Sequence, residues 1–296
     1  RRGLLPKFAR AAGEGRPGGV DLGGQGLGDA QLEALLCDDS LMPLDKIFRW
    51  RLRDTRLTSA GLCALSTKLP AHTEVLDVTV NEVGARGAEA LSGLMAGGGL
   101  PRLLRLDVSA NGLRNDAITA LAGGLALCPL LVRLDLNHND FNEGAALGKL
   151  IEGHNHLTRL SLHCNFLSGE GAAALFRGLL HNSTRGGRLA DVDLAWNCIG
   201  DEGSEAGAAA VSAVLRESTT LYHLDLSYNG LGAAACAVVA QGLRDNHHLY
   251  GLHFVGNAAT MDADGFLRPL GGATPRLPES PQRGRPSPLS FGDPRC

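Results

Sequence analysis

Side chains that could do chemistry are present in this chain, but none of them falls in a known catalytic motif. The hydrolase motif G-x-S-x-G and the zinc-protease motif H-E-x-x-H are absent, as is a phosphate-binding loop ending in Gly-Lys-Ser/Thr. Glycines at positions 23, 24, 26 and 28 lie inside a repeat rather than between a strand and a dinucleotide-binding helix. The sequence therefore predicts a protein that is not an enzyme and that needs no cofactor.

His138, His163 and Cys164 are the residues that come nearest to a metal-ligand set. Zinc takes four ligands that converge in a tetrahedron, supplied by cysteine, histidine or carboxylate side chains. The three residues fall in the same part of two successive repeats, described below, and we expect rigid strands to point them outward in parallel. The sequence therefore predicts no metal site.

The cysteines indicate the compartment. There are seven, at positions 37, 63, 128, 164, 198, 236 and 296. The number is odd and no two have C-x-x-C spacing, whereas a zinc ribbon or a disulfide framework needs closer, paired cysteines. Since no secretory signal is evident, we expect a reducing, intracellular compartment, the cytoplasm, with a cytoskeletal or ciliary assembly as an alternative.

Charge and hydropathy exclude other classes of partner. The formal net charge of −3 is too small to indicate a nucleic acid or a membrane surface. No apolar run reaches the roughly 18 residues that a membrane-spanning helix requires. The expected partner is another protein.

The elements that must position these side chains form a repeat. The frame apolar-x-apolar-x-x-Asn, whose places we number one to six, occurs seven times, and two degenerate copies precede them. The sixth places are residues 25, 55, 81, 111, 139, 165, 197, 229 and 257. The spacing of 26 to 32 residues leaves room for one strand and one helix in each copy.

Each part of the frame has a physical role. Apolar residues at places one and three put two side chains on one face of a short strand. The Asn ends the strand and turns inward, where its amide both donates to and accepts from the backbone. Gly or Ala follows six residues later in copies two to eight, at positions 61, 87, 117, 145, 171, 203 and 235. Such a small residue would let a helix pack close to the strands, and leucines at 65, 91, 121 and 175 continue it at helical spacing.

The repeat resembles the ribonuclease-inhibitor-like class of leucine-rich repeat proteins, which includes the GTPase-activating protein for Ran and the repeat domains of NOD-like receptors. The resemblance covers about residues 18 to 267. It implies an α/β solenoid of about nine repeats, a horseshoe with parallel strands on the concave face and helices on the convex face. Because the class is defined by core positions, the resemblance predicts the fold and is nearly silent on function.

Both ends differ in composition from the predicted repeat domain, residues 20–267. Residues 1–19 hold five basic side chains against one glutamate, and we interpret them as a basic segment, a partial cap or the edge of a fragment, since the chain opens without Met. An organelle transit segment is the alternative. Residues 268–296 hold seven of the 13 prolines and are predicted to be a disordered tail.

The concave face should present places two, four and five as columns of solvent-facing side chains about 4.8 Å apart. Place two is Asp in six of nine copies, which forms an acidic stripe. The stripe would attract a basic partner. The alternative is that Asp is simply common at this place in the family. Place five runs His, Cys, Trp, Tyr through copies five to eight, and Trp and Tyr are frequent anchors of binding sites. The predicted partner-binding residues are Asp135, His138, His163, Asp193, Trp196, Asp225 and Tyr228.

A scaffold or adaptor that binds another protein on its concave face is the function that such a surface favours, either alone or as a subunit of a larger intracellular assembly. The resemblance adds two alternatives. One is a GTPase activator similar to the Ran-specific protein, which would act by docking on a GTPase. The other is the ligand-sensing part of a NOD-like receptor.

Overall fold

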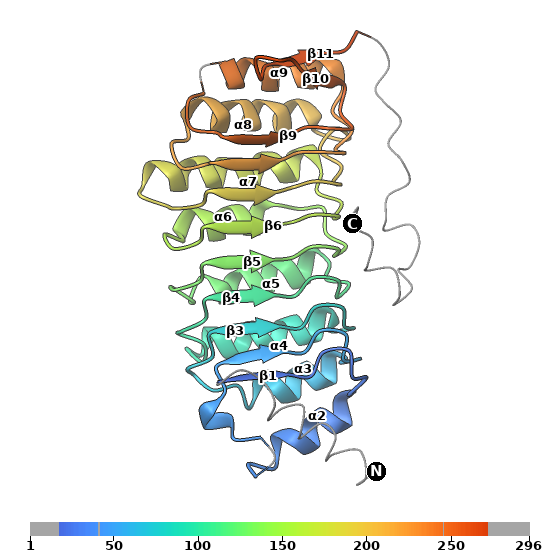
Figure 1. Cartoon of the computed structure of the whole chain (residues 1–296), viewed down its shortest axis with the longest axis vertical. Coiled ribbons are helices and arrows are strands. Elements are labelled where there is room, and N and C mark those ends of the chain that lie inside the picture. Colours follow the sequence, from blue (N-terminus) through green and yellow to red (C-terminus); the bar gives the residue numbers. More distant parts are fainter. Residues whose placement is uncertain (1–17, 41, 245, 272–296) are drawn as a thin grey trace.

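The nine copies of the frame form nine parallel strands of one sheet. The computed structural model describes residues 18–40, 42–244 and 246–271. The strands follow one another across the sheet in sequence order, and each pairs in register with the next (Figure 1). They are β1 Gly19–Asp21, β2 Arg49–Arg51, β3 Val75–Asp77, β4 Arg105–Asp107, β5 Arg133–Asp135, β6 Arg159–Ser161, β7 Asp191–Asp193, β8 His223–Asp225 and β9 Gly251–His253. This register stacks the same place of every copy into a column.

A helix follows each of the first eight strands and lies behind the sheet (Figure 1). The helices are α2 Asp29–Leu36, α3 Ser59–Ser66, α4 Gly84–Ala96, α5 Asn115–Leu125, α6 Ala145–Gly153, α7 Gly169–Thr184, α8 Ser204–Glu217 and α9 Ala233–Arg244. A short 3-10 helix, Leu44–Lys46, leads into β2. The expected α/β solenoid of nine repeats is confirmed. We name the side of the sheet opposite the helices the strand face.

The Asn at place six ties successive repeats together through the backbone. Asn81 Nδ2 donates to the carbonyl oxygens of Leu52 at 2.7 Å and Val78 at 2.8 Å, and Asn81 Oδ1 accepts from Leu57 N at 2.9 Å. Each of the later frame asparagines makes the same donation to its own repeat and to the one before, at positions 111, 139, 165, 197, 229 and 257. The inward turn and double role of this amide are confirmed. Because these groups are buried, each lost bond would leave an unsatisfied carbonyl.

Place five of each frame has left-handed backbone geometry, which the sequence did not indicate. Positive φ occurs at this place in all nine copies, including His138 at 52°, Cys164 at 53°, Trp196 at 58° and Tyr228 at 56°. A non-glycine residue in this region carries a conformational cost of about 1 to 3 kcal/mol. The peptide N–H at this place donates to the next repeat, as from Trp196 N to the Ser227 carbonyl at 2.9 Å, and this ladder holds the strained turn.

The small residues that follow the Asn pack the helices as expected in five of the seven copies, and the exceptions are Ala145, which is exposed at the start of α6, and Gly203. A Cβ on Gly171 would lie 2.4 Å from the Asn142 carbonyl oxygen, so a larger side chain would push the repeats apart. Gly203 does not lie in a helix; it is the N-cap of α8 with φ of 76°. The extra residues of that repeat delay the helix, and Gly207 is the glycine that α8 buries.

The preceding 32-residue repeat places part of its extra length in its helix, since α7 continues to Thr184. Asn182 is buried in that last turn, where its Nδ2 donates to the carbonyl oxygens of Ile151 at 2.7 Å and His154 at 3.1 Å. The additional turn of helix is therefore fixed by its contacts with α6.

The two ends of the sheet are closed differently. In the second copy, Thr55 occupies the Asn place and its Oγ1 donates to the Leu52 carbonyl at 2.7 Å. After β9 the chain forms an antiparallel hairpin of β10, Ala259–Met261, and β11, Leu267–Pro269, which packs on α9 (Figure 1). The hairpin crosses the domain boundary predicted at residue 267. Residues 1–17 and 272–296, which hold most of the basic segment and of the Pro-rich tail, lie outside the described residues.

Candidate functional site on the strand face

Charged side chains on the strand face form two columns rather than one acidic stripe. The residue before place one is Arg in β2, β4, β5 and β6, next to the Asp column at place two. Arg105 Nη2 lies 3.3 Å from Asp107 Oδ2 and 3.4 Å from Asp135 Oδ2, and Arg133 Nε lies 2.7 Å from Asp135 Oδ2. The predicted acidic stripe is therefore neutralised across β4 and β5.

Asp135 is the residue for which the expected exposure is wrong. Its side chain is 2% exposed, because Arg133 of its own strand and Arg105 of β4 lie against it. Burial raises the pKa of this carboxyl above its ordinary value, and the hydrogen bond from Arg133 and the two arginine charges offset only part of that rise. Asp135 stabilises the sheet and is not accessible to a partner.

His138, His163 and Cys164 converge, contrary to the expectation that they point outward in parallel. One ligand atom from each lies within 4.8 Å of the others, and the two imidazole rings are 5.6 Å apart at their centroids. Cys164 is buried rather than solvent-facing. Strand alternation holds only for extended backbone, and the left-handed residues at 138 and 164 end it. Burial, with some repulsion from His163, lowers the pKa of His138 to about 4, so this imidazole is neutral at pH 7.

Asp193 on β7 is half-buried and lies next to this cluster. Its Oδ1 accepts from Ala195 N at 3.0 Å and lies 3.7 Å from His163 Nδ1, and its Oδ2 accepts from Ser161 Oγ at 3.4 Å. Burial raises the pKa of Asp193, but the bonds and charge from these partners outweigh burial and lower it overall. Asp193 is therefore a carboxylate at neutral pH, directed at the His163 ring.

Trp196 and Tyr228, at place five of the next two repeats, form an aromatic stack on the turn that ends β7 and β8. Their ring centroids are 4.2 Å apart with 19° between the planes. Asp225 lies on β8 nearby, and its Oδ1 accepts from Ser227 N at 2.8 Å. Within the described part of the chain no lysine, arginine or histidine makes an ion pair with Asp225. This carboxylate therefore differs from Asp135, whose charge is compensated internally.

A second aromatic stack, which the sequence reasoning missed, lies at the opposite end of the same strands. Tyr222 and Tyr250 directly precede β8 and β9, and their ring centroids are 5.2 Å apart with nearly parallel planes, at 4°. Tyr222 is 53% exposed and Tyr250 is 83% exposed. The signal was available as one more column of the repeat, the residue two before place one, which also holds Leu104 and Val132.

The structure thus brings the seven predicted residues together on one face but divides them by role. Asp135 is a structural ion-pair partner. His138 and His163 converge with Cys164, and Asp193 contacts His163. Trp196, Asp225 and Tyr228 lie on β8 and on the turns that end β7 and β8. We name the surface formed by Trp196, Tyr222, Asp225, Tyr228 and Tyr250 the aromatic face.

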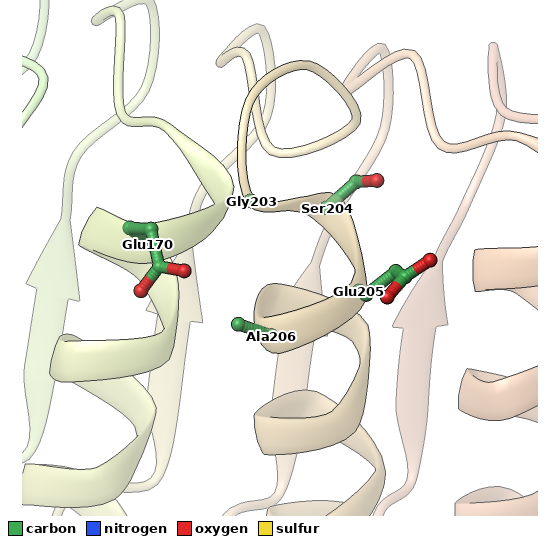
Figure 2. A pocket seen from close by; sticks show the side chains of 5 residues that line it. All are labelled: Glu170, Gly203, Ser204, Glu205 and Ala206. Atoms are coloured by element: carbon green, nitrogen blue, oxygen red, sulfur yellow. The ribbon is translucent and has the colours of Figure 1, made fainter.

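Away from the strand face, a hollow of about 410 Å³ lies between the N-terminal ends of α7 and α8 (Figure 2). Glu170, Gly203, Ser204, Glu205 and Ala206 line it. The carboxylate of Glu170 extends from α7 toward α8 in this view. Two glutamates and no basic side chain line this hollow, so it is not a site for phosphate or another anion. Among the described residues, no helix is both long and apolar enough to cross a membrane.

Comparisons with known proteins agree with this architecture. A family model described as Leucine Rich repeat matches residues 74–92, 153–176, 189–206 and 217–240. Ribonuclease inhibitor from Sus scrofa is 30% identical over 86% of this chain and 55% of its own length. Tonsoku-like protein from Mus musculus is 32% identical over 68% of this chain and 16% of its own length.

Among solved structures, an internalin from Listeria monocytogenes matches 74% of this chain and 59% of its own, with 20% identity and a TM-score of 0.44. The chain spans about half or less of the length of the two relatives above.

Proposed function

This chain is a leucine-rich repeat protein of the ribonuclease-inhibitor-like class, and on that premise we propose that it is a protein-binding scaffold whose partner lies across the aromatic face. The repeats provide a rigid surface, and the functional residues are those that the repeat does not need for packing. The observation that carries the proposal is the pair of aromatic stacks, Trp196 with Tyr228 and Tyr222 with Tyr250, at the two ends of the same short strands.

Aromatic side chains in this arrangement are suited to recognition. Tyr and Trp supply large contact areas at low entropic cost and are enriched among residues whose truncation costs 2 kcal/mol or more of binding free energy. Stacking holds each ring against its neighbour before a partner arrives, so little conformational freedom remains to be lost on binding. Tyr222 and Tyr228 are six residues apart, at most about 20 Å along an extended chain.

The charge between the stacks favours a basic partner. Asp225 lies on the strand that joins Tyr222 to Tyr228, and its only described hydrogen bond comes from a backbone N–H. A lysine or arginine of the partner would neutralise this carboxylate and could lie over an aromatic ring as well. We therefore propose a partner segment of about six extended residues with apolar side chains at its ends and a basic side chain between them.

The compartment proposed is reducing and cytoplasmic. Cysteines 37, 63, 128, 198 and 236 carry free thiols. Burial raises the pKa of Cys128 and Cys236 to about 11, which keeps both as unreactive thiols.

Affinity capture from a lysate of the source cells tests this function, with retained proteins identified by mass spectrometry. The wild-type chain is compared with a Trp196→Ala/Tyr228→Ala variant, a Tyr222→Ala/Tyr250→Ala variant, and a Leu127→Ala/Leu130→Ala control. The control removes exposed apolar side chains that lie between α5 and β5, away from the aromatic face. We expect one discrete partner that both aromatic variants lose and the control keeps. Retention of the same proteins by all four folded chains would contradict the proposal.

A further inference from the structure

We propose that His138, His163 and Cys164 form a binding site for a soft divalent metal ion such as Zn²⁺. The site is separate from the aromatic face and does not depend on a partner. The three residues belong to the turns that end β5 and β6, and a ligand atom from each lies within 4.8 Å of the others. Two imidazoles and a thiolate are ligand types that bind zinc in preference to hard cations such as Mg²⁺.

The backbone explains how a solenoid can bring these side chains together. Residues 138 and 164 are left-handed, with φ of 52° and 53°, so neither continues the alternation of its strand. His138 N donates to the His163 carbonyl at 2.9 Å, which fixes the two turns against each other. The three ligands are therefore positioned by backbone hydrogen bonds and do not depend on a mobile loop.

His163 carries the clearest sign of an unused ligand. Its Nε2 is buried and has no hydrogen-bond partner among the described residues. A buried polar atom without a partner costs free energy comparable to a lost hydrogen bond, and a bound ion would remove that cost. The other ring nitrogen, Nδ1, lies 3.7 Å from Asp193 Oδ1.

Asp193 supplies the outer contact that metal-binding histidines usually have. A carboxylate at one imidazole nitrogen fixes the ring orientation and makes the other nitrogen a better ligand. Asp193 is itself held by Ala195 N at 3.0 Å and by Ser161 Oγ at 3.4 Å. The arrangement of carboxylate, His163 and ion would therefore be oriented before the ion binds.

Three protein ligands leave the fourth tetrahedral position to a water molecule. On binding, the Cys164 thiol becomes a thiolate and its proton passes to solvent, while both imidazoles bind as neutral rings. No fourth ligand joins these three among the described residues, so an ion held here would keep a coordination position open to exchange.

Titration of the full, untagged, reduced chain with Co²⁺ tests this site, because a cobalt–thiolate bond gives a charge-transfer absorption band and tetrahedral cobalt gives intense visible bands. We expect one Co²⁺ per chain with the thiolate band, and displacement of the cobalt by Zn²⁺. Cys164→Ser should lose the thiolate band, and His138→Gln should lose affinity by at least about tenfold. Asp193→Asn acts through His163 and should weaken binding about 10- to 100-fold while keeping the band.

A second histidine pair provides the matched control. His223 and His253 lie on β8 and β9 with ring centroids 5.0 Å apart and with Asp191 at 3.2 Å from His223 Nδ1, but no cysteine joins them in the described structure. His223→Gln/His253→Gln should leave the band and the affinity unchanged. Circular dichroism establishes that each variant is folded. Absence of the thiolate band in the wild-type chain, or a band that survives Cys164→Ser, would overturn the proposal.

Discussion

Repeats four to six and repeats seven to nine share the same frame, but the charged side chains on their strands have different roles. In the first region the place-two aspartates are held by the arginine column, and Asp135 is buried under Arg105 and Arg133. In the second, the arginine positions hold Asp191, His223 and Gly251, so Asp225 has no arginine on its own or a neighbouring strand. An Asp column alone therefore does not define an acidic surface. The column beside it decides whether the charge stabilises the sheet or remains for a partner.

The largest contrast that we predict is in stability. Asp135→Ala removes a buried carboxylate and leaves two arginines without their shared partner, and we expect it to lower the free energy of unfolding by about 2 to 3 kcal/mol. Asp225→Ala, at the same place of the frame, loses one hydrogen bond from Ser227 N and should cost less than about 1 kcal/mol. Urea denaturation of both variants measures the difference. Equal losses would remove the distinction between the two regions.

The next contrast is in the salt dependence of partner binding. An uncompensated carboxylate steers a basic partner, so raising the ionic strength from low to physiological should slow association by about tenfold. Asp225→Asn should remove much of this dependence. Asp107→Asn should leave it unchanged, because Arg105 lies 3.3 Å from Asp107 Oδ2. Stopped-flow association rates with the captured partner, at several salt concentrations, compare the three chains; a larger effect of Asp107→Asn would reverse the assignment.

A smaller effect is predicted for pH, and it originates in the first region. Burial lowers the pKa of His154, while a hydrogen bond between its Nε2 and the Cys128 carbonyl partly opposes the shift. His154 binds a proton near pH 6.5 in the unfolded chain but only at lower pH in the folded chain. The free energy of unfolding therefore falls as the pH drops below 6.5 toward the pKa of the folded state. One such group contributes at most about 1.4 kcal/mol per pH unit.

His154→Gln is the variant that isolates this contribution, because its amide can still donate to the Cys128 carbonyl. Its free energy of unfolding should fall less than that of the wild type between pH 7.5 and 5.5. Chemical denaturation at each pH measures both chains. Parallel curves for the two would assign the acid sensitivity to other histidines, of which His138, with its pKa of about 4, is the first candidate.

The fold was predictable from the sequence because its determinants are periodic. Leucines at places one and three, the Asn at place six and the small residue six positions later recur in register, and each is required by burial or by a backbone bond. Leu65, Leu91, Leu121 and Leu175 are all buried as the spacing predicts. Departures from the period were harder to place, and Gly203 became a helix cap because the extra residues of its repeat come before α8.

The site was predictable only in part, because exposure depends on neighbours that the frame does not contain. Trp196 and Tyr228 do form a pair. Asp135 is buried because Arg133 precedes it by two residues and Arg105 lies on the adjacent strand. The convergence on Cys164 depends on left-handed backbone at place five, where glycine occurs only in the first and last copies, as Gly24 and Gly256. Tyr222 and Tyr250 lie two residues before place one and so outside the frame.

Photo-crosslinking at one position of the repeat compares the two regions most directly. Tyr222 and Val132 both directly precede a strand, both are exposed, and their backbone N–H groups make equivalent bonds of 2.8 Å to the preceding repeat. Each is replaced separately by p-benzoylphenylalanine, and the folded chain is irradiated in a lysate of the source cells. We predict a discrete crosslinked partner from position 222 and none from position 132. A partner captured from position 132 alone would place binding on repeats four to six and contradict the proposed role of the aromatic face.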